Sequence, residues 1–391
     1  MRIFPLLLCG ALALPASAQQ TASNGYELLV KAGKSYIEGE EGFPVTKNLA
    51  PQENLRRQRA SVARNAKSLE LIRQALQAGI QPPLLTDIEV VFSNNSKWRA
   101  LTRLLAQEAA VRVASGKPAE AINSHLDAME MGASLARNGV IVNALFGLAL
   151  EYIGRSNMQI AAEKLDAAQC RAAAARLAQM EKLRPPLGEI LRAEAAFMRR
   201  EAVKAFAARR DPAKRAKEEE FQKASKADKR IMLAMTPARF NADLARLIEA
   251  DVKRNRLSYQ AAQKVRLPST RNPDLDGLAE ILQGQGLRFN LERSAAHDRL
   301  WRGALELRAQ KLESGVYPRK FAAPLDPFSN SQPLIYKSDG DEYLLYSIGP
   351  DGKDDGGAEI QTVLTDDETG VQTISNRVLI ESIGDIVAPV L

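Results

Sequence analysis

The residues best suited to chemistry form a short acidic loop near the C-terminus. The stretch Gly349–Gly357 reads GPDGKDDGG, so three carboxylates, Asp351, Asp354 and Asp355, stand among four glycines. Glycine permits tight backbone turns, and carboxylates and backbone carbonyls together supply oxygen atoms. Hard divalent cations bind through such oxygens. The loop therefore predicts a metal site, and the alternative is a solvated acidic turn that binds nothing.

Two short β-strands must position this loop. The runs Leu334–Tyr336 and Tyr343–Ile348 are rich in β-forming residues and are separated by turn residues at Asp339–Asp341, which is the signal of a hairpin. The second run leads directly into the acidic loop. Beyond the loop, similar runs between turn residues predict further strands at Gln361–Leu364, Val371–Ile374 and Val378–Ile383.

A long helix is predicted ahead of the hairpin, over Leu291–Glu313. A Gly-x-Tyr-Pro turn at Gly315–Pro318 comes directly after this helix. Further along the chain come, in this order, Asp326-Pro327-Phe328, Tyr343–Ser347 and Gly349–Gly352. This order resembles the globular part of the major pseudopilin of type II secretion systems. The matching pieces cover less than a fifth of the 391 residues.

The resemblance implies a small helix-plus-antiparallel-sheet module over residues 288–391, closed by a loop that holds structural Ca²⁺. In that family aspartates and backbone carbonyls bind the ion. Asp351 matches the aspartate of the family's Asp-Gly, and Asp354 or Asp355 stands in the acidic part of the loop. The family's later Asp-Ile is Glu359-Ile360 here, which departs from the pattern. Lys353 at the third position excludes an EF-hand.

The chain also departs from a pseudopilin at its beginning. A pseudopilin starts with a prepilin leader and an apolar helix that spans the membrane and packs the filament. Here the first residues read as a cleavable Sec-type signal peptide over residues 1–18, with Arg2, an apolar Leu6–Leu14 and a cleavage site after Ala18. A lipoprotein signal at Cys9 is the alternative, but Leu8 stands where a small residue is needed. The chain is therefore expected not to be a filament subunit.

Most of the remaining sequence predicts α-helices. Ala, Leu, Glu, Lys and Arg dominate residues 24–283, and apolar residues recur there at three- and four-residue spacing. Ser115–Pro118 ends one helix and starts the next, as in a helical hairpin of the tetratricopeptide type. No second copy appears at that period, so an irregular α-helical array is expected. The predicted fold class is α+β, an α-helical array followed by the pseudopilin-like module.

Residues that carry catalysis in common enzyme classes are scarce. The chain has two histidines, His125 and His297, far apart and on predicted helices. It has no G-x-S-x-G, P-loop or dinucleotide-binding motif. Loss of Cys9 with the signal peptide leaves Cys170 alone, which excludes an intrachain disulfide and favours a buried thiol. No catalytic or cofactor-binding residue is predicted, and a non-enzymatic protein is favoured over an enzyme with a histidine-free site between helices.

The segment Arg199–Arg230 carries twelve Lys and Arg against six Asp and Glu. One interpretation is a surface that binds anionic polymers or membranes. The favoured interpretation is a solvated or partly disordered segment of mixed charge, because such runs commonly face water. The segment has no interleaved aromatic residues and no nucleic-acid-binding motif, so no specific nucleic acid partner is expected.

These observations predict an exported envelope protein, periplasmic or secreted, that presents a helical surface to a protein partner which the sequence does not identify. Outside the signal peptide, no stretch of apolar residues approaches the length that a membrane span needs. The net charge of +7 favours only weak contact with anionic surfaces. A link to a type II secretion-like apparatus follows from the C-terminal resemblance alone.

Overall fold

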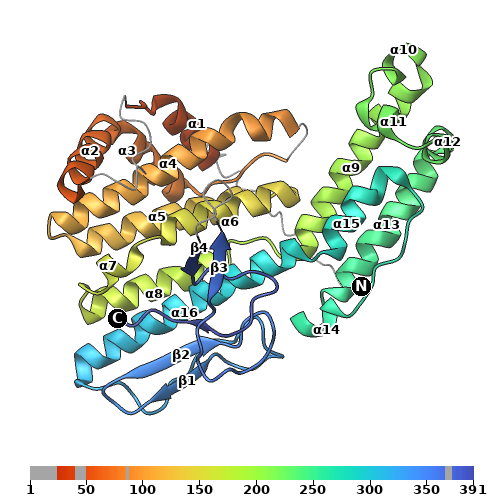
Figure 1. Ribbon diagram of the computed structural model, residues 1–391. Helices are drawn as coiled ribbons and strands as arrows, with labels where there is room; N and C mark the ends of the chain where they lie inside the picture. Colours follow the sequence, from red (N-terminus) through yellow and green to blue (C-terminus); the bar gives the residue numbers. More distant parts are fainter. Residues whose placement is uncertain (1–23, 40–49, 85–87, 366–371) are drawn as a thin grey trace, which may run out of the picture.

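The protein belongs to the α+β class, as the sequence predicts. The structure, a computed structural model, describes residues 24–39, 50–84, 88–365 and 372–391 (Figure 1). Helices occupy most of the chain up to residue 314, and short antiparallel strands follow. The expected signal peptide lies outside the described residues. None of the described helices combines the length and the apolar character that crossing a membrane requires.

The helices have the following bounds: α1 (Gly25–Ser35), α2 (Pro51–Arg64), α3 (Ala66–Ala78), α4 (Ile88–Ala114), α5 (Pro118–Leu135), α6 (Ile141–Arg155), α7 (Met158–Ala162), α8 (Ala167–Glu181), α9 (Leu187–Arg210), α10 (Pro212–Arg215), α11 (Glu219–Lys223), α12 (Lys226–Ala234), α13 (Pro237–Arg254), α14 (Tyr259–Gln263), the 3₁₀-helix η1 (Pro273–Leu275), α15 (Asp276–Gln283) and α16 (Gly286–Ser314). The strands are β1 (Ile335–Ser338), β2 (Tyr343–Ser347), β3 (Thr362–Thr365), β4 (Gln372–Ser375) and β5 (Ile386–Val387).

The predicted hairpin of α4 and α5 is confirmed. Gly116 adopts a φ of +74°, a left-handed conformation that glycine reaches without strain, and Pro118 is the first residue of α5. Helix α4 runs unbroken from Ile88 to Ala114, across the polar residues 93–96. Its Asn94 hydrogen-bonds to Tyr26 of α1, so this polar residue is used for packing rather than for a loop.

Helices α5 and α6 pack unusually closely because glycines line their crossing. A Cβ atom on Gly147 would lie 2.6 Å from the carbonyl oxygen of Gly132, and the reverse contact is also 2.6 Å. About two turns further along α6, a Cβ on Gly154 would meet the backbone nitrogen of Met129 at 2.9 Å. The close approach fixes how α5 lies against α6, and α5 in turn positions the groove described below.

Residues 187–283 form a second helical lobe, seen at the right of Figure 1, around a core that includes Leu191, Phe240 and Leu247. The segment at 199–230, expected to be solvated or partly disordered, is ordered as the end of α9 and α10–α12, and most of its charged residues are exposed to solvent. Arg209 explains part of the difference. Its buried guanidinium bonds to Glu218 and to Asp274 of η1. The segment is therefore joined to the lobe by ion pairs that a charge count does not reveal.

Helix α16 joins the helical part of the chain to the sheet. Trp301 and Leu305 lie in a core shared with α5 and α8, whereas Leu300 and Leu307 lie in a core shared with the strands. Gln285, at φ +54°, separates α15 from α16, and its side chain donates to the carbonyl of Ala262. The buried side chain of Gln285 thus fixes the junction between α15 and α16.

A buried cluster of four charged side chains holds α16 against α6 and the end of α8. Arg184 donates to both Glu151 of α6 and Asp298 of α16. Arg155 also donates to Asp298, and it reaches Ser294, which donates to Glu151 at 3.1 Å. Burial alone lowers the pKa of Arg184, but the two carboxylates outweigh it and raise that pKa. Burial in turn raises the pKa of Asp298, but the charges of Arg184 and Arg155 outweigh burial and lower it, so this pair stays charged.

The small sheet has the order β1-β2-β5, with both pairs antiparallel, and β3 and β4 form a separate hairpin. Antiparallel strands at the C-terminus agree with the predicted class. The strand expected at residues 378–383 is wrong, because the Ser382 amide donates to the carbonyl of Leu379 and its hydroxyl accepts the amide of Leu379. This turn delays the last strand to Ile386–Val387.

The crossing of α5 and α6 predicts a large effect of one methyl group. We expect Gly147→Ala to lower the free energy of unfolding by about 2–3 kcal/mol, because the new Cβ meets a backbone oxygen that has no room to move. Chemical denaturation at constant pH measures this change. Gly277→Ala in α15 is the matched control, since no atom lies within 4 Å of its Cβ, and it should leave stability unchanged or improve it. Equal effects of the two substitutions would contradict the proposed crossing.

A second prediction concerns pH, because His297 of α16 lies beside this charged cluster. Burial and the charges of Arg155 and Arg293 lower its pKa from 6.5 to about 3. Between about pH 3 and pH 6.5 the unfolded chain therefore binds a proton at His297 that the folded chain does not bind. The free energy of unfolding falls as pH falls through this window. Between pH 7 and pH 5 His297 should cost about 2 kcal/mol.

His297→Gln should reduce the loss of unfolding free energy between pH 7 and pH 5 by that amount, as measured by urea denaturation at both pH values. His125, whose pKa burial also lowers, remains in the variant and accounts for part of the residual loss. An unchanged pH dependence in His297→Gln would show that His297 is not buried in the way described.

Candidate functional site

The acidic loop of residues 349–357 follows directly on β2. Asp326 fixes the start of the loop, because its buried carboxylate accepts the Ser347 hydroxyl at 2.7 Å and the Ile348 amide at 2.9 Å. The loop is thus carried on a rigid strand end. Its shape depends on left-handed glycines, among them Gly352 at φ +71°.

The three predicted ligands have different surroundings. Asp354 accepts the Tyr346 hydroxyl at 2.8 Å and the Gly356 amide at 2.9 Å, and these two bonds lower its pKa. Asp351 accepts the Lys353 amide through one oxygen, and its other oxygen is buried without a hydrogen-bond partner. Asp355 is exposed to solvent. The loop therefore carries the predicted carboxylates, but each serves a different local role.

A fourth carboxylate, Asp385, reaches the loop from the start of β5. Its side chain is fully buried, and its Oδ2 accepts the Gly357 amide at 2.7 Å, whereas its Oδ1 has no hydrogen-bond partner. Burial raises the pKa of Asp385, and the charges of Asp354 and Asp355 raise it further. Sequence reasoning missed this residue because the strand expected at 378–383 ended before it. An isolated aspartate within the apolar run IGDIV was the available signal.

Backbone pairing holds Asp385 at the loop. The Asp385 amide donates to the carbonyl of Ala358 at 2.8 Å, and its carbonyl accepts the Ile360 amide at 3.1 Å. Among the described residues, however, no group of three or more His, Cys, Asp or Glu side chains is arranged to hold a metal ion. Tyr346 raises the pKa of Lys337, and the charges of Asp354 and Asp385 raise it further. The Lys337 ammonium group therefore lies near these carboxylates. A cation would therefore have to draw the carboxylates together and would compete with this ammonium group.

The loop also rests on the second helical lobe. A Cβ on Gly352 would lie 2.5 Å from the side-chain nitrogen of Gln260 in α14. That nitrogen is buried without a hydrogen-bond partner. The acidic loop is thus in contact with α14 as well as with the sheet.

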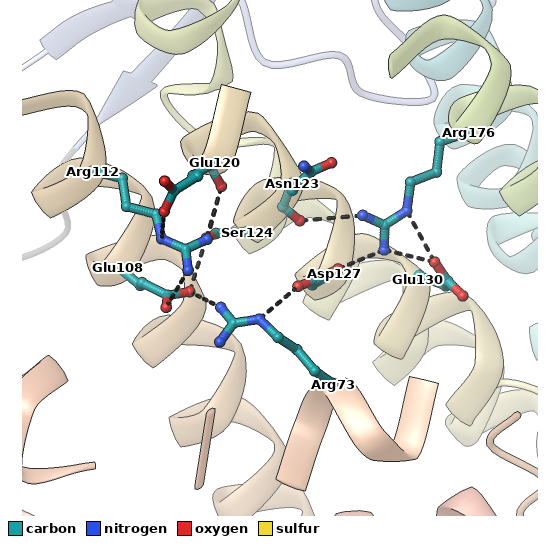
Figure 2. Close-up of polar contacts among 9 residues, drawn as sticks. All are labelled: Arg73, Glu108, Arg112, Glu120, Asn123, Ser124, Asp127, Glu130 and Arg176. Carbon is teal, nitrogen blue, oxygen red and sulfur yellow. Dashed lines mark hydrogen bonds and ion pairs between the residues drawn. The ribbon is translucent and has the colours of Figure 1, made fainter. Parts of the chain in front are cut away.

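A second candidate site is a groove along one face of α5, with a volume of about 440 Å³ (Figure 2). Helices α3 and α4 line one wall and α8 lines the other. The lining residues are Arg73, Leu76, Gln77, Arg112, Glu120, Asn123, Asp127, Glu130 and Arg176. The four residues from α5 are spaced by three, four and three positions, which places them on one helix face. The sequence shows this spacing, but only the fold shows that α3 and α8 leave this face of α5 uncovered.

Three arginines converge on the groove from different helices (Figure 2). Arg73 pairs with Glu108 and, at 3.6 Å, with Asp127. Arg176 donates to Asp127 at 2.6 Å and to Glu130 at 2.8 Å, so Asp127 is shared by two arginines. Figure 2 shows these contacts running across α5 from α3 to α8.

Arg112 completes this arrangement at the other end of the groove. It pairs with Glu108 at 2.9 Å and donates to the Ser124 hydroxyl at 2.8 Å, and Ser124 donates in turn to Glu108. Four carboxylates therefore lie against three guanidinium groups at the groove. The carboxylates are those of Glu108, Glu120, Asp127 and Glu130. A polar ligand would exchange hydrogen bonds with these pairs rather than fill an apolar cavity.

The two histidines lie on separate helices, His125 on α5 and His297 on α16. His125 is buried in α5, and its Nδ1 bonds to the carbonyl oxygen of Gly154 at 2.7 Å, while burial lowers its pKa. The neighbouring Ser124 bonds to Glu108 instead. Cys170 is a buried free thiol whose pKa burial raises, in agreement with the expectation of a packing role.

No protein-family model matches the chain, and neither a curated protein nor a solved structure matches it significantly. The resemblance of residues 288–391 to a pseudopilin module therefore stays a prediction.

The contact between the loop and α14 yields a prediction about stability. We expect Gly352→Ala to cost more free energy of unfolding than Gly356→Ala, by about 1–2 kcal/mol. Both glycines have positive φ, but a Cβ at Gly356 meets nothing within 4 Å, whereas at Gly352 it meets Gln260. Thermal and urea unfolding of the full chain measure both. Gln260→Ala should remove the difference, and a difference that persists in that background would contradict the contact.

Proposed function

We propose that the chain is a non-enzymatic, exported scaffold that binds a partner protein through a polar segment lying along α5. The groove between α3, α4, α5 and α8 carries this proposal. A polar chain segment suits it better than an apolar anchor, because charged and amide groups dominate its lining. Protein-binding surfaces commonly use arginine, which has several donors on one rigid group.

The way the groove is built supports this proposal. Its side chains project from four helices that are packed by buried apolar residues, and Asp127 and Glu108 are themselves buried. The ion pairs hold these side chains in place before a ligand binds, and this reduces the side-chain entropy that is lost on binding. The sequence-based expectation of export, and of a structural calcium ion at the acidic loop, belongs to the same proposal. The pseudopilin resemblance makes a component of a secretion apparatus one candidate partner.

Blocking the groove tests the proposal without breaking its ion pairs. Asn123 is exposed at the groove, and its backbone carbonyl accepts a hydrogen bond from Arg176 at 3.4 Å. Asn123→Trp should fill the groove, and Asn241→Trp on an exposed position of α13 is the matched control. Random twelve-residue peptides displayed on phage are selected on the wild-type chain, and their affinities for the three proteins are then measured with synthetic peptides.

We expect selected peptides to bind Asn123→Trp at least tenfold more weakly than the wild type and to bind Asn241→Trp normally. Circular dichroism and unfolding midpoints confirm that both variants fold. Peptides that bind all three proteins equally, or a selection that enriches none, would refute the groove as the binding surface.

A further inference from the structure

The excess positive charge of the chain belongs to the second helical lobe. Residues 187–283 contain 21 lysine and arginine residues against 14 aspartate and glutamate residues, whereas the rest of the chain contains 33 of each kind. The net charge of +7 is therefore the charge of this lobe. A separation of charge of this kind favours an anionic partner for the lobe, because a partner of that sign is attracted to one part of the surface.

The exposed charges at the tip of the lobe are mostly positive. The tip comprises residues 199–234, which are the end of α9 with α10–α12, and Figure 1 shows it at the end of the lobe far from the sheet. Nine of its twelve lysine and arginine residues are exposed, whereas two of its six acidic residues are. Glu218 pairs with the buried Arg209, and Asp211 caps the start of α10, so these acids serve the fold. The surface of the tip is thus more basic than a charge count of the segment indicates.

Two helix faces at the tip combine these charges with an exposed apolar residue. Val203 of α9 is 60% exposed, and it lies between Arg199 and Arg210 at helical spacings of four and seven residues. Leu233 of α12 is 50% exposed, and Arg230 precedes it by three residues on the same face. Basic residues beside an exposed apolar residue are typical of a helix that lies at the surface of an anionic membrane.

The aromatic residues of the tip do not favour a nucleic acid. The tip, all of whose residues the structure describes, contains two aromatic side chains, Phe206 and Phe221, and both are buried. Phe206 packs against Phe240 in the core of the lobe. Proteins that bind single-stranded nucleic acids stack bases on exposed aromatic rings, which this surface does not offer. A lipid surface instead supplies anionic headgroups for the basic residues and an apolar boundary for Val203 and Leu233.

We propose that the tip of the second lobe binds to an anionic lipid surface. The lysine and arginine side chains contact the headgroups, and Val203 and Leu233 enter the boundary between headgroups and acyl chains. Several basic residues act together in such a contact, because each one near the surface adds to the attraction. The tip is a different surface from the groove along α5, so a chain held in this way keeps the groove open to its own ligand.

Cosedimentation of the full chain with vesicles tests the proposal. One set of vesicles contains equal parts of phosphatidylglycerol and phosphatidylcholine, and the other contains phosphatidylcholine alone. We expect the chain to bind the first set and not the second, and we expect high salt to weaken the binding because it screens the charges.

Two variants with the same net charge locate the contact. The tip variant combines Lys214→Gln, Lys217→Gln, Lys226→Gln and Arg230→Gln. The control variant combines Lys31→Gln, Lys67→Gln, Lys164→Gln and Lys182→Gln, which are exposed positions outside the lobe. We expect the tip variant to bind the anionic vesicles at least hundredfold more weakly than the control variant. Circular dichroism and unfolding midpoints check that both variants fold.

The apolar contribution has a control of the same residue type and exposure. Leu233→Ser should weaken binding to the anionic vesicles at least fivefold, because its side chain leaves water on binding. Leu312 of α16 is also 50% exposed but lies outside the lobe, and Leu312→Ser should bind as the wild type does.

The remaining outcomes would each overturn the proposal. A wild-type chain that does not bind the anionic vesicles excludes a lipid contact, and equal binding by the two four-residue variants would assign the effect to net charge alone. Equal binding to the vesicles by Leu233→Ser and Leu312→Ser, with binding of dextran sulfate as tight as that of the vesicles, would identify soluble polyanions as the ligands. Asn123→Trp should bind the vesicles normally, and loss of binding in that variant would place the lipid contact at the groove instead.

Discussion

The buried charges of Glu151, Arg155, Arg184 and Asp298 are the constraint on which the arrangement of the molecule depends. Two buried carboxylates are paired with two largely buried guanidinium groups at one point where α6, the end of α8 and α16 meet. Such charges are tolerated only when each finds its partners, because an unpaired one costs several kcal/mol. The geometry of the three segments is therefore specified far more narrowly than apolar packing alone would specify it.

Both candidate sites depend on elements that this cluster aligns. Helix α16 carries the sheet, and the sheet carries the acidic loop through Asp326 and β2. On the other side, α6 packs through its glycines against α5, whose opposite face lines the groove. The groove and the loop lie on different supports, so a ligand at one of them is not required for the other to form.

The sequence predicts the class of the fold and the main helices because those properties are local. Apolar spacing and turn residues identify the α4–α5 hairpin and β2. Properties that depend on distant partners are not predictable in this way. The segment at 199–230 is joined to the second lobe by the ion pair of Arg209 with Asp274, which lie 65 positions apart. The groove, likewise, exists only because α3 and α8 leave one face of α5 open, and Asp385 joins the loop only through pairing with residues 358–360.

The sheet order has a consequence for how the chain acquires its structure. Strand β2 pairs on one side with β1, which is close in sequence, and on the other with β5, some 40 residues later. The Tyr343 hydroxyl donates to the carbonyl of Pro389, and that of Tyr317 donates to the carbonyl of Leu391. Non-local contacts form late, since closing long loops must precede them. A chain that emerges N-terminus first, from a ribosome or a translocation channel, would therefore assemble its helical array early and close its sheet only after residues 386–391 have emerged.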